Sequence, residues 1–305
     1  MKTVVVGAGA VGCFFGGMLA RAERDVIFLT HSREQADLLN REGLNIDSLN
    51  FSDKLPVRAT AEPDVLTDAD FVLFCVKSPD TARTARALSP HFNPESLIIS
   101  LQNGVDNADK ISANSNVEAA AAVVYVGAEM LAPNHVKHNG RGDLVIGRLN
   151  GSEKTKTGLE KLSRLFQKAG VPCVVSENVR AELWTKLIIN CAYNAVSALS
   201  QSAYGRMVED EETRRLMNRI IDESLEVASA DGVELDENDL REKTFRIGSA
   251  MPGAFSSMAQ DIERGRVTEI DALNGFVAKR GKESGIPTPV NQTLVSLIKL
   301  LERSA

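Results

Sequence analysis

Three polar residues recur at every fourth position of an otherwise apolar stretch, and their types suit chemistry. Within residues 182–199, Lys186, Asn190 and Asn194 would place an ammonium group and two carboxamides along one face of a helix. The rest of the stretch is apolar nearly all round, which is typical of a buried helix. Burying an unpaired neutral polar group costs about 2–7 kcal/mol, so this polar stripe needs a partner.

Two kinds of partner would satisfy the stripe. One is a polar ligand held in a cleft. The other is internal: Lys186 pairs with Glu182 one turn earlier, and the asparagines cap neighbouring loops. The stretch alone leaves both interpretations open.

A second group of residues, at the start of the chain, is suited to holding phosphates. The β-branched run from Thr3 to Val6 predicts a buried parallel strand, and it leads into Gly7, Ala8, Gly9, Ala10, Val11 and Gly12 and then a helix. In this GxGxxG pattern Gly7 permits a tight turn, Gly9 lets a pyrophosphate approach the backbone, and Gly12 lets helix pack on strand. The free N–H groups of the helix N-terminus favour an anion, so we expect a dinucleotide site.

The end of the second strand bears on which dinucleotide binds. An NAD site usually carries Asp or Glu about 20 residues past the glycines. Here the strand predicted for residues 25–30 ends in Thr30, His31, Ser32 and Arg33. The missing acid and the nearby Arg33 favour the 2′-phosphate of NADP. The alternative is that Arg33 is simply a solvated residue of a helix's first turn.

Two further polar side chains follow predicted strands of the same sheet. Lys77 comes after the buried run 69–76, and Asn103 after the run 96–100. Because ligands bind at the carboxyl ends of parallel strands, both side chains are candidates for one site. The alternatives are a surface charge for Lys77 and an ordinary Asn-Gly turn for Asn103.

These residues must be positioned by two kinds of architecture. Up to about residue 177 the chain alternates strands and helices, and β-rich segments at 117–126, 134–138 and 143–147, joined through a turn at Asn139-Gly140, predict an antiparallel extension of the sheet. After residue 178 the periodicity is helical, over 180–199, 209–230, 237–248, 254–264, 267–284 and 289–303. We therefore predict an α/β fold, with a Rossmann-like doubly wound sheet in residues 1–177 and an all-helical domain in 178–305. The cleft between them is the expected site.

Composition narrows the class of protein. The 305 residues are 43% apolar and 25% charged, which is typical of globular proteins, and the net charge of −6 argues against a nucleic-acid partner. No apolar run is long enough for a membrane span, and no signal peptide is recognisable. The four cysteines lack CxxC spacing and suggest buried thiols in a cytoplasmic protein, and no metal-binding pattern is seen. His135 and His138 are expected to be exposed beside a turn.

Taken in order, the motifs resemble the ketopantoate reductase (2-dehydropantoate 2-reductase) family across nearly the whole chain. They are GAGAVG at 7–12, CVKS at 75–78, LQNG at 101–104, ELWTKLIINCAYN at 182–194 and SSMAQDIERGRVTEIDALNG at 256–275. The resemblance implies NADPH-dependent reduction of 2-dehydropantoate to pantoate, in pantothenate and coenzyme A biosynthesis. The chain departs from the family at His31, where the family often has Arg, and its own Arg33 comes two residues later.

The resemblance also implies residue roles. Lys186 matches the proton donor, and Glu269 the acid that binds the reacting oxygen and the substrate hydroxyl; Asn103, Asn190, Asn194 and Ser257 match substrate-contacting positions. Lys77 matches a cofactor-side lysine. In addition to the glycine loop, we expect His31, Arg33, Asn103 and Glu269 to contact the cofactor. Without the resemblance, Glu269 would be interpreted as an acid near the start of the helix at 267–284, and Ser256 and Ser257 as a helix start.

These residue types suit a hydride transfer to a keto acid. A protonated Lys186 can hydrogen-bond the carbonyl oxygen and give it a proton, while amides and hydroxyls orient the substrate. Two alternatives stay open: a related NADP-dependent reductase of another 2-keto acid, and a non-catalytic NADP(H) sensor. A homodimer would be consistent with the apolar helical domain.

Overall fold

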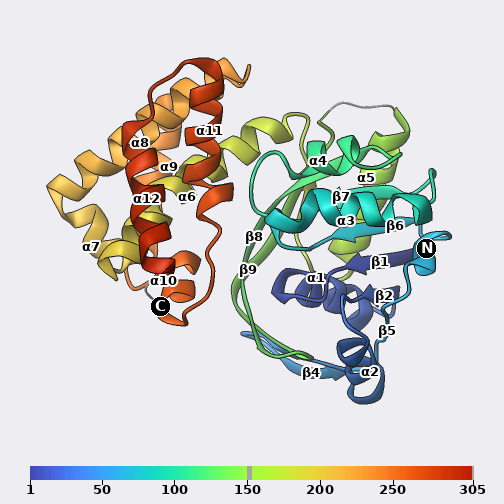
Figure 1. Ribbon diagram of the computed structural model, residues 1–305. Coiled ribbons are helices and arrows are strands. Elements are labelled where there is room, and N and C mark those ends of the chain that lie inside the picture. Colours follow the sequence, from blue (N-terminus) through green and yellow to red (C-terminus); the bar gives the residue numbers. More distant parts are fainter. Residues whose placement is uncertain (150–152, 304–305) are drawn as a thin grey trace. The chain divides into compact units, whose positions relative to one another are not determined.

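The chain forms two compact units, Met1–Val179 and Arg180–Ala305. A computed structural model describes residues 1–149 and 153–303. The first unit combines strands and helices, whereas the second is helical (Figure 1). Across the described residues no helix combines the length and the apolar character needed to cross a membrane.

The first unit is organised around one curved sheet. Its described strands are β1 (Lys2–Val6), β2 (Asp25–Leu29), β3 (Leu44–Asp47), β4 (Ser52–Leu55), β5 (Arg58–Thr60), β6 (Phe71–Phe74), β7 (Leu97–Ser100), β8 (Ala119–Ala132), β9 (His135–Gly147) and β10 (Cys173–Val175). Their order is β4-β3-β9-β8-β7-β6-β1-β2-β5, with β10 pairing β9. The six strands from β8 to β5 in this order are all parallel. The chain moves outward from β1 in both directions, which is the doubly wound topology predicted from the sequence.

Buried apolar runs account for the central strands. β6 and β7 are buried at every position, as expected of parallel strands covered on both faces.

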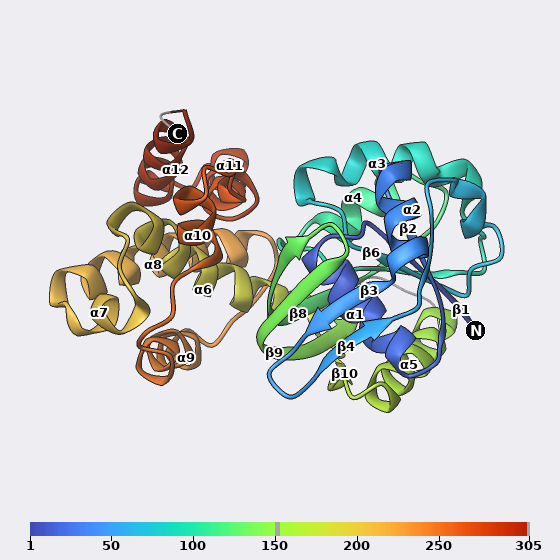
Figure 2. The same ribbon diagram turned by 90° about the horizontal axis from the view of Figure 1, so that it is seen from below.

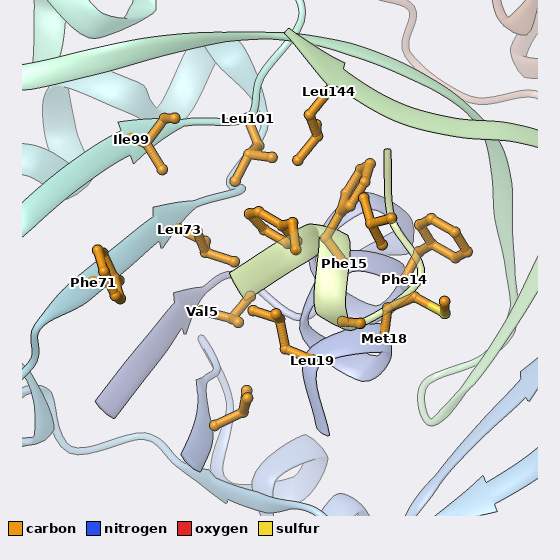
Figure 3. Close-up of a cluster of buried hydrophobic side chains, with 14 of the residues drawn as sticks. Val5, Phe14, Phe15, Met18, Leu19, Phe71, Leu73, Ile99, Leu101 and Leu144 are labelled. Atoms are coloured by element: carbon orange, nitrogen blue, oxygen red, sulfur yellow. The ribbon is translucent and has the colours of Figure 1, made fainter. Parts of the chain in front are cut away.

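The described helices of this unit are α1 (Ala10–Arg21), α2 (Arg33–Glu42), α3 (Thr81–Leu88), α4 (Asn107–Ala113) and α5 (Glu153–Lys168), with 3₁₀ turns η1 (Pro63–Leu66), η2 (Ser78–Asp80) and η3 (Ser89–His91). Side chains of α1 such as Phe15 and Leu19 lie in the core with Val5 and Leu73 of the sheet (Figure 3). This packing fixes α1 directly after the glycine loop.

The outer part of the sheet is built by a long hairpin. Strands β8 and β9 pair antiparallel and curve along the side of the unit, next to β3 and β4 (Figure 2). The antiparallel extension was predicted, but the turn at Asn139-Gly140 was wrong. β9 runs straight through these residues, and the hairpin turns at Pro133-Asn134. Gly140 and Gly142 have φ values of +148° and +136°. Their positive φ accommodates an irregularity in the pairing of β9 with β8, not a turn.

The two histidines of this hairpin are therefore strand residues. His135 Nε2 lies 2.6 Å from the Asp47 carboxylate, and His138 Nδ1 lies 2.8 Å from the Ser48 hydroxyl. The ring of His138 also stacks on Phe14, with centroids 4.3 Å apart. They are half-buried partners of the β3 segment, not exposed residues beside a turn.

The second unit packs around one long helix, α6 (Val179–Ser200). The other described elements are α7 (Tyr204–Glu209), α8 (Glu211–Ala230), α9 (Glu237–Ala250), α10 (Ser257–Glu263), η4 (Ile270–Ala272), α11 (Asn274–Ser284) and α12 (Pro289–Glu302). Trp184 of α6 is fully buried with its ring edge-on to Phe276 of α11, and Tyr193 lies against Tyr204 of α7. Aromatic contacts on two sides make α6 the core of this unit.

One predicted helix is shorter than expected. The helical prediction for 267–284 fails before Asn274, where the chain forms only the 3₁₀ turn η4. Thr268 explains the difference, because its N–H and its hydroxyl both donate to Glu302 Oε1 of α12, at 2.8 and 2.7 Å. The bond from Ile270 N–H to Thr268 Oγ1 then turns the chain. Glu269 thus lies in a turn rather than in an α-helix.

Candidate active site

The glycine loop forms a tight turn that leads directly into α1. Gly7 has φ +101°, and an added Cβ there would come within 3.1 Å of the backbone of Cys75, the residue directly after β6. At Gly12 an added Cβ would lie 2.1 Å from the Gly7 carbonyl oxygen, so only glycine lets α1 start so close to β1. A Cβ at Gly9 would meet no protein atom within 4 Å. Gly9 therefore faces open space at the N-terminus of α1, where a phosphate can bind.

Buried polar side chains hold the next two loops of this sheet edge together. Asn107 Nδ2 donates to the carbonyl oxygen of Asn103 at 2.7 Å, and Ser78 Oγ donates to the same oxygen at 2.7 Å. Thr81 Oγ1 lies 2.9 Å from Asn107 Oδ1. These bonds join the loop after β6 to the loop after β7.

Gln102 adds a second connection between the same loops. Its amide nitrogen donates to Val76 O at 2.8 Å and to Thr81 Oγ1 at 2.6 Å, and its oxygen accepts from Ser100 at 3.0 Å. Lys77, which follows Val76, is exposed, and Asn103 is half-buried. The structure thus brings the loops of these two predicted residues side by side at the carboxyl ends of β6 and β7.

The positioning residues of this edge were mostly missed by the sequence analysis. Thr81 and Asn107 are buried polar residues at the starts of α3 and α4, and α4 was not predicted. The sequence feature that could have identified them is a hydrogen-bonding side chain shortly after each of two predicted strands, because a buried polar group there needs hydrogen-bond partners.

The third predicted region, at the end of β2, is exposed. Ser32 caps α2 by accepting from the Gln35 N–H at 3.2 Å, and the Gln35 side chain donates to Ala8 O in the glycine loop at 2.9 Å. His31 and Arg33 on either side of Ser32 are both exposed. The Arg33 guanidinium lies 2.5 Å from the carboxylate of Glu62. A 2′-phosphate ligand is chemically compatible with Arg33 and His31 at this place.

In the second unit, the predicted polar stripe lies on α6 as expected. Lys186 and Asn190 are half-buried, and Asn194 is buried with 6% of its surface exposed. All three belong to consecutive turns of one helix, so their spacing matches the face predicted from the sequence.

Two anchors tie other predicted site segments to this helix. Ser256, the N-cap of α10, accepts from Ala259 N–H at 3.0 Å and donates to the Asn194 carbonyl at 3.2 Å. This bond fixes the exposed Ser257 beside the last turn of the stripe. Asn274 Nδ2 donates to the Cys191 carbonyl at 3.2 Å and to Asn291 Oδ1 at 3.0 Å.

The second anchor positions the Glu269 turn. Asn274 begins α11 directly after η4, and half-buried Glu269 is the residue before η4. Asn291 is in turn held by Glu223, which accepts from its side chain at 2.7 Å. A buried chain of amides thus connects the Glu269 turn to α6 between Asn190 and Asn194.

A doubly wound sheet with a glycine loop is typical of dinucleotide-binding proteins, and the chain matches known sequences over nearly its full length. Residues 3–151 match the family described as ketopantoate reductase PanE/ApbA, and residues 178–302 match its C-terminal counterpart. The 2-dehydropantoate 2-reductase of Halobacterium salinarum is 32% identical over 307 residues, covering 99% of each chain. That of Vibrio cholerae is 30% identical, covering 100% of this chain and 99% of its own.

Solved structures of proteins with the same fold are consistent with these sequence matches. A PanE/ApbA family ketopantoate reductase from Ralstonia eutropha has 44% sequence identity and a TM-score of 0.91, covering 100% of this chain and 99% of that one. D-mandelate dehydrogenase, solved with NADH and anilino(oxo)acetate, has the same fold with a TM-score of 0.91, at 22% identity. This chain belongs to the ketopantoate reductase family, a family of nicotinamide-dependent oxidoreductases.

Proposed function

We propose that this chain reduces 2-dehydropantoate to pantoate with NADPH, as a step of pantothenate and coenzyme A biosynthesis. The observation that carries the proposal is the polar stripe of α6. Its last turns are bonded to the segments that hold Ser257 and Glu269, in a family member whose first unit has a dinucleotide loop. Such a set of amide, hydroxyl, carboxyl and ammonium groups fits a small polar keto acid.

In this proposal the first unit holds the cofactor. The loop Gly7–Gly12 binds the pyrophosphate, with the N-terminus of α1 facing its charge. Lys77, Asn103 and Glu269 complete the cofactor contacts. When bound, the cofactor supplies the hydride that converts the 2-keto carbon to an alcohol carbon.

The residues of α6 would provide the proton and the substrate contacts. Lys186 Nζ hydrogen-bonds the keto oxygen and donates the proton that the new alcohol needs, which is general acid catalysis worth about 10²–10⁴-fold. Its charge also stabilises the negative charge developing on that oxygen. Asn190, Asn194, Ser257 and Asn103 orient the carboxylate and the hydroxyl of the substrate, and Glu269 accepts a hydrogen bond from that hydroxyl.

NADPH rather than NADH is proposed from the end of β2. No acid follows β2 at Thr30, His31 or Ser32 to accept from a ribose 2′-hydroxyl. Exposed Arg33 and His31 there can bind a phosphate.

We also propose a cellular location and an oligomeric state for this chain. All four cysteines are free thiols, which supports a cytoplasmic location. Leu297 and Leu300 of α12 are exposed, as is Val267. These apolar residues support self-association as a homodimer, which light scattering on the purified chain would measure.

A substrate panel tests the function directly. The oxidation of NADPH is followed at fixed enzyme concentration against 2-dehydropantoate and a set of branched and aromatic 2-keto acids. We expect the highest kcat/KM for 2-dehydropantoate. Preference for another acid would replace only the substrate, whereas cofactor binding without turnover of any acid would indicate a sensor and refute the enzymatic proposal.

A further inference from the structure

The ion pair at the end of β2 brings an acid to the place where the adenosine ribose binds in this fold. β5 pairs in parallel with β2, and Thr60 lies opposite Leu29, so the two strands end side by side. Arg33 is the first residue of α2 after β2, and Glu62 lies two residues past the end of β5. Glu62, which follows the neighbouring strand, thus lies beside Arg33 at this edge of the sheet.

Local bonds hold both partners at this edge. The Glu62 N–H donates to Thr60 Oγ1 at 3.0 Å, and Pro63 follows as the first residue of η1. On the other side, Thr30 Oγ1 donates to Ser32 O at 2.8 Å, directly before Arg33. The 2.5 Å contact between Arg33 and Glu62 therefore joins two fixed backbone segments.

We propose that Glu62 is a specificity-determining residue that competes with a 2′-phosphate for Arg33 and so reduces the preference of this chain for NADPH over NADH. This inference rests on the proposed NADPH function. The side chains are 77% and 61% exposed, so a phosphate can reach the guanidinium from solvent. An exposed ion pair is weak and yields to a dianion, but the carboxylate must first be displaced from the guanidinium. The neutral 2′-hydroxyl of NADH leaves the pair intact.

Nucleotide titrations of the full chain test this inference. Dissociation constants for NADPH and NADH are measured by nicotinamide fluorescence for the unchanged chain, for Glu62→Gln and for Glu42→Gln. Glu42 is a matched control, because it is an exposed acid 2.9 Å from Arg41 at the opposite end of α2, and its replacement removes the same charge. We expect Glu62→Gln to bind NADPH about three- to tenfold more tightly, with NADH within about twofold.

The same titrations show which results would contradict the role proposed for Glu62. Equal NADPH affinities of the Glu62→Gln and Glu42→Gln variants would overturn the inference, and so would an equal gain for NADH. The gain must also disappear in an Arg33→Ala background, since a gain that persists there does not act through Arg33. If the unchanged chain binds neither nucleotide, the proposed cofactor itself is wrong, which separates that failure from failure of the role given to Glu62.

Discussion

At the scale of single residues, Lys186 is the group on which the proposed chemistry depends. Replacing it by Ala removes the proton donor, so we expect kcat with 2-dehydropantoate to fall about 10²–10⁴-fold while the dissociation constant for NADPH changes little. Steady-state kinetics and a fluorescence titration measure the two quantities. Lys243→Ala is the control, because Lys243 is an exposed lysine of the same unit that pairs with Asp239. Unchanged kcat in Lys186→Ala would remove Lys186 from the mechanism.

Two glycines of the same loop separate folding from binding. A methyl group at Gly12 would collide with the Gly7 carbonyl, whereas one at Gly9 would meet no protein atom. We therefore expect Gly12→Ala to lower the free energy of unfolding by about 2 kcal/mol or more. Gly9→Ala should change it by less than about 1 kcal/mol, because Gly9 has an extended backbone that Ala can adopt.

The binding measurement completes this comparison. The Gly9 methyl would fill the space that the pyrophosphate needs, so NADPH affinity should fall at least about tenfold although the protein remains folded. Thermal unfolding and nucleotide titration of both variants check the two effects. Tight NADPH binding by Gly9→Ala would contradict the placement of the pyrophosphate.

At the scale of elements, Asn107 on α4 links the loops that follow β6 and β7. It is buried and bonds Asn103 O, with Thr81 and Ser78 as further partners. Replacement by Ala removes one hydrogen bond from each of these three groups, and we expect the free energy of unfolding measured in urea to fall by about 2–3 kcal/mol. KM for the keto acid should rise, because the Asn103 loop loses its support. Asn116→Ala, at an exposed position just after α4, should change neither quantity.

The elements also show where prediction from the sequence succeeds. Strands such as β6 and β7 are continuous buried runs, and the glycine loop lies between a strand and a helix, so local pattern is enough to find them. The stripe of Lys186, Asn190 and Asn194 was found for the same reason, because α6 is long and regular.

The errors arise where distant residues decide the structure. Asn139-Gly140 has turn chemistry, but pairing with β8 keeps it in a strand. The segment before Asn274 has helical periodicity, but Glu302 at the end of α12 captures Thr268. The Arg33–Glu62 pair and the Asn107–Ser78 bond likewise join residues that are 29 positions apart. Neighbouring sequence carries no direct signal for such contacts.

At the scale of the whole molecule, the four cysteines report on the folding of both units. Burial raises the pKa of Cys13 and Cys173 to about 12, and it raises the pKa of Cys75 and Cys191 above the usual range. Because the thiolate is the reactive form, we expect the native chain at pH 8 to react very slowly with Ellman's reagent. The unfolded chain should react at once at all four thiols and release four equivalents of thionitrobenzoate per chain. A rapidly reacting thiol in the native chain would contradict this.

The sign of the pH effect follows from the same shifts. An unfolded thiol loses its proton near pH 8.5, and a folded one only near 12. The thiols therefore stabilise the folded state fully below about pH 8.5, and this contribution declines as the pH rises toward 12.

The pairing of β3 with β9 affects how the chain folds during its synthesis. Asn45, Ile46 and Asp47 take as their parallel partners His135, Val136 and Lys137, and buried Asn134 bonds back to Gly43. On the ribosome, β3 is complete on the order of 90 residues before its neighbour exists, which at about 5–20 residues per second is roughly 5–20 s. Over that interval one side of the β3–β4 hairpin is an open strand edge, the kind of surface that pairs with other chains. This edge is covered only once β9 has been synthesised, and His135 of β9 then forms its contact with Asp47.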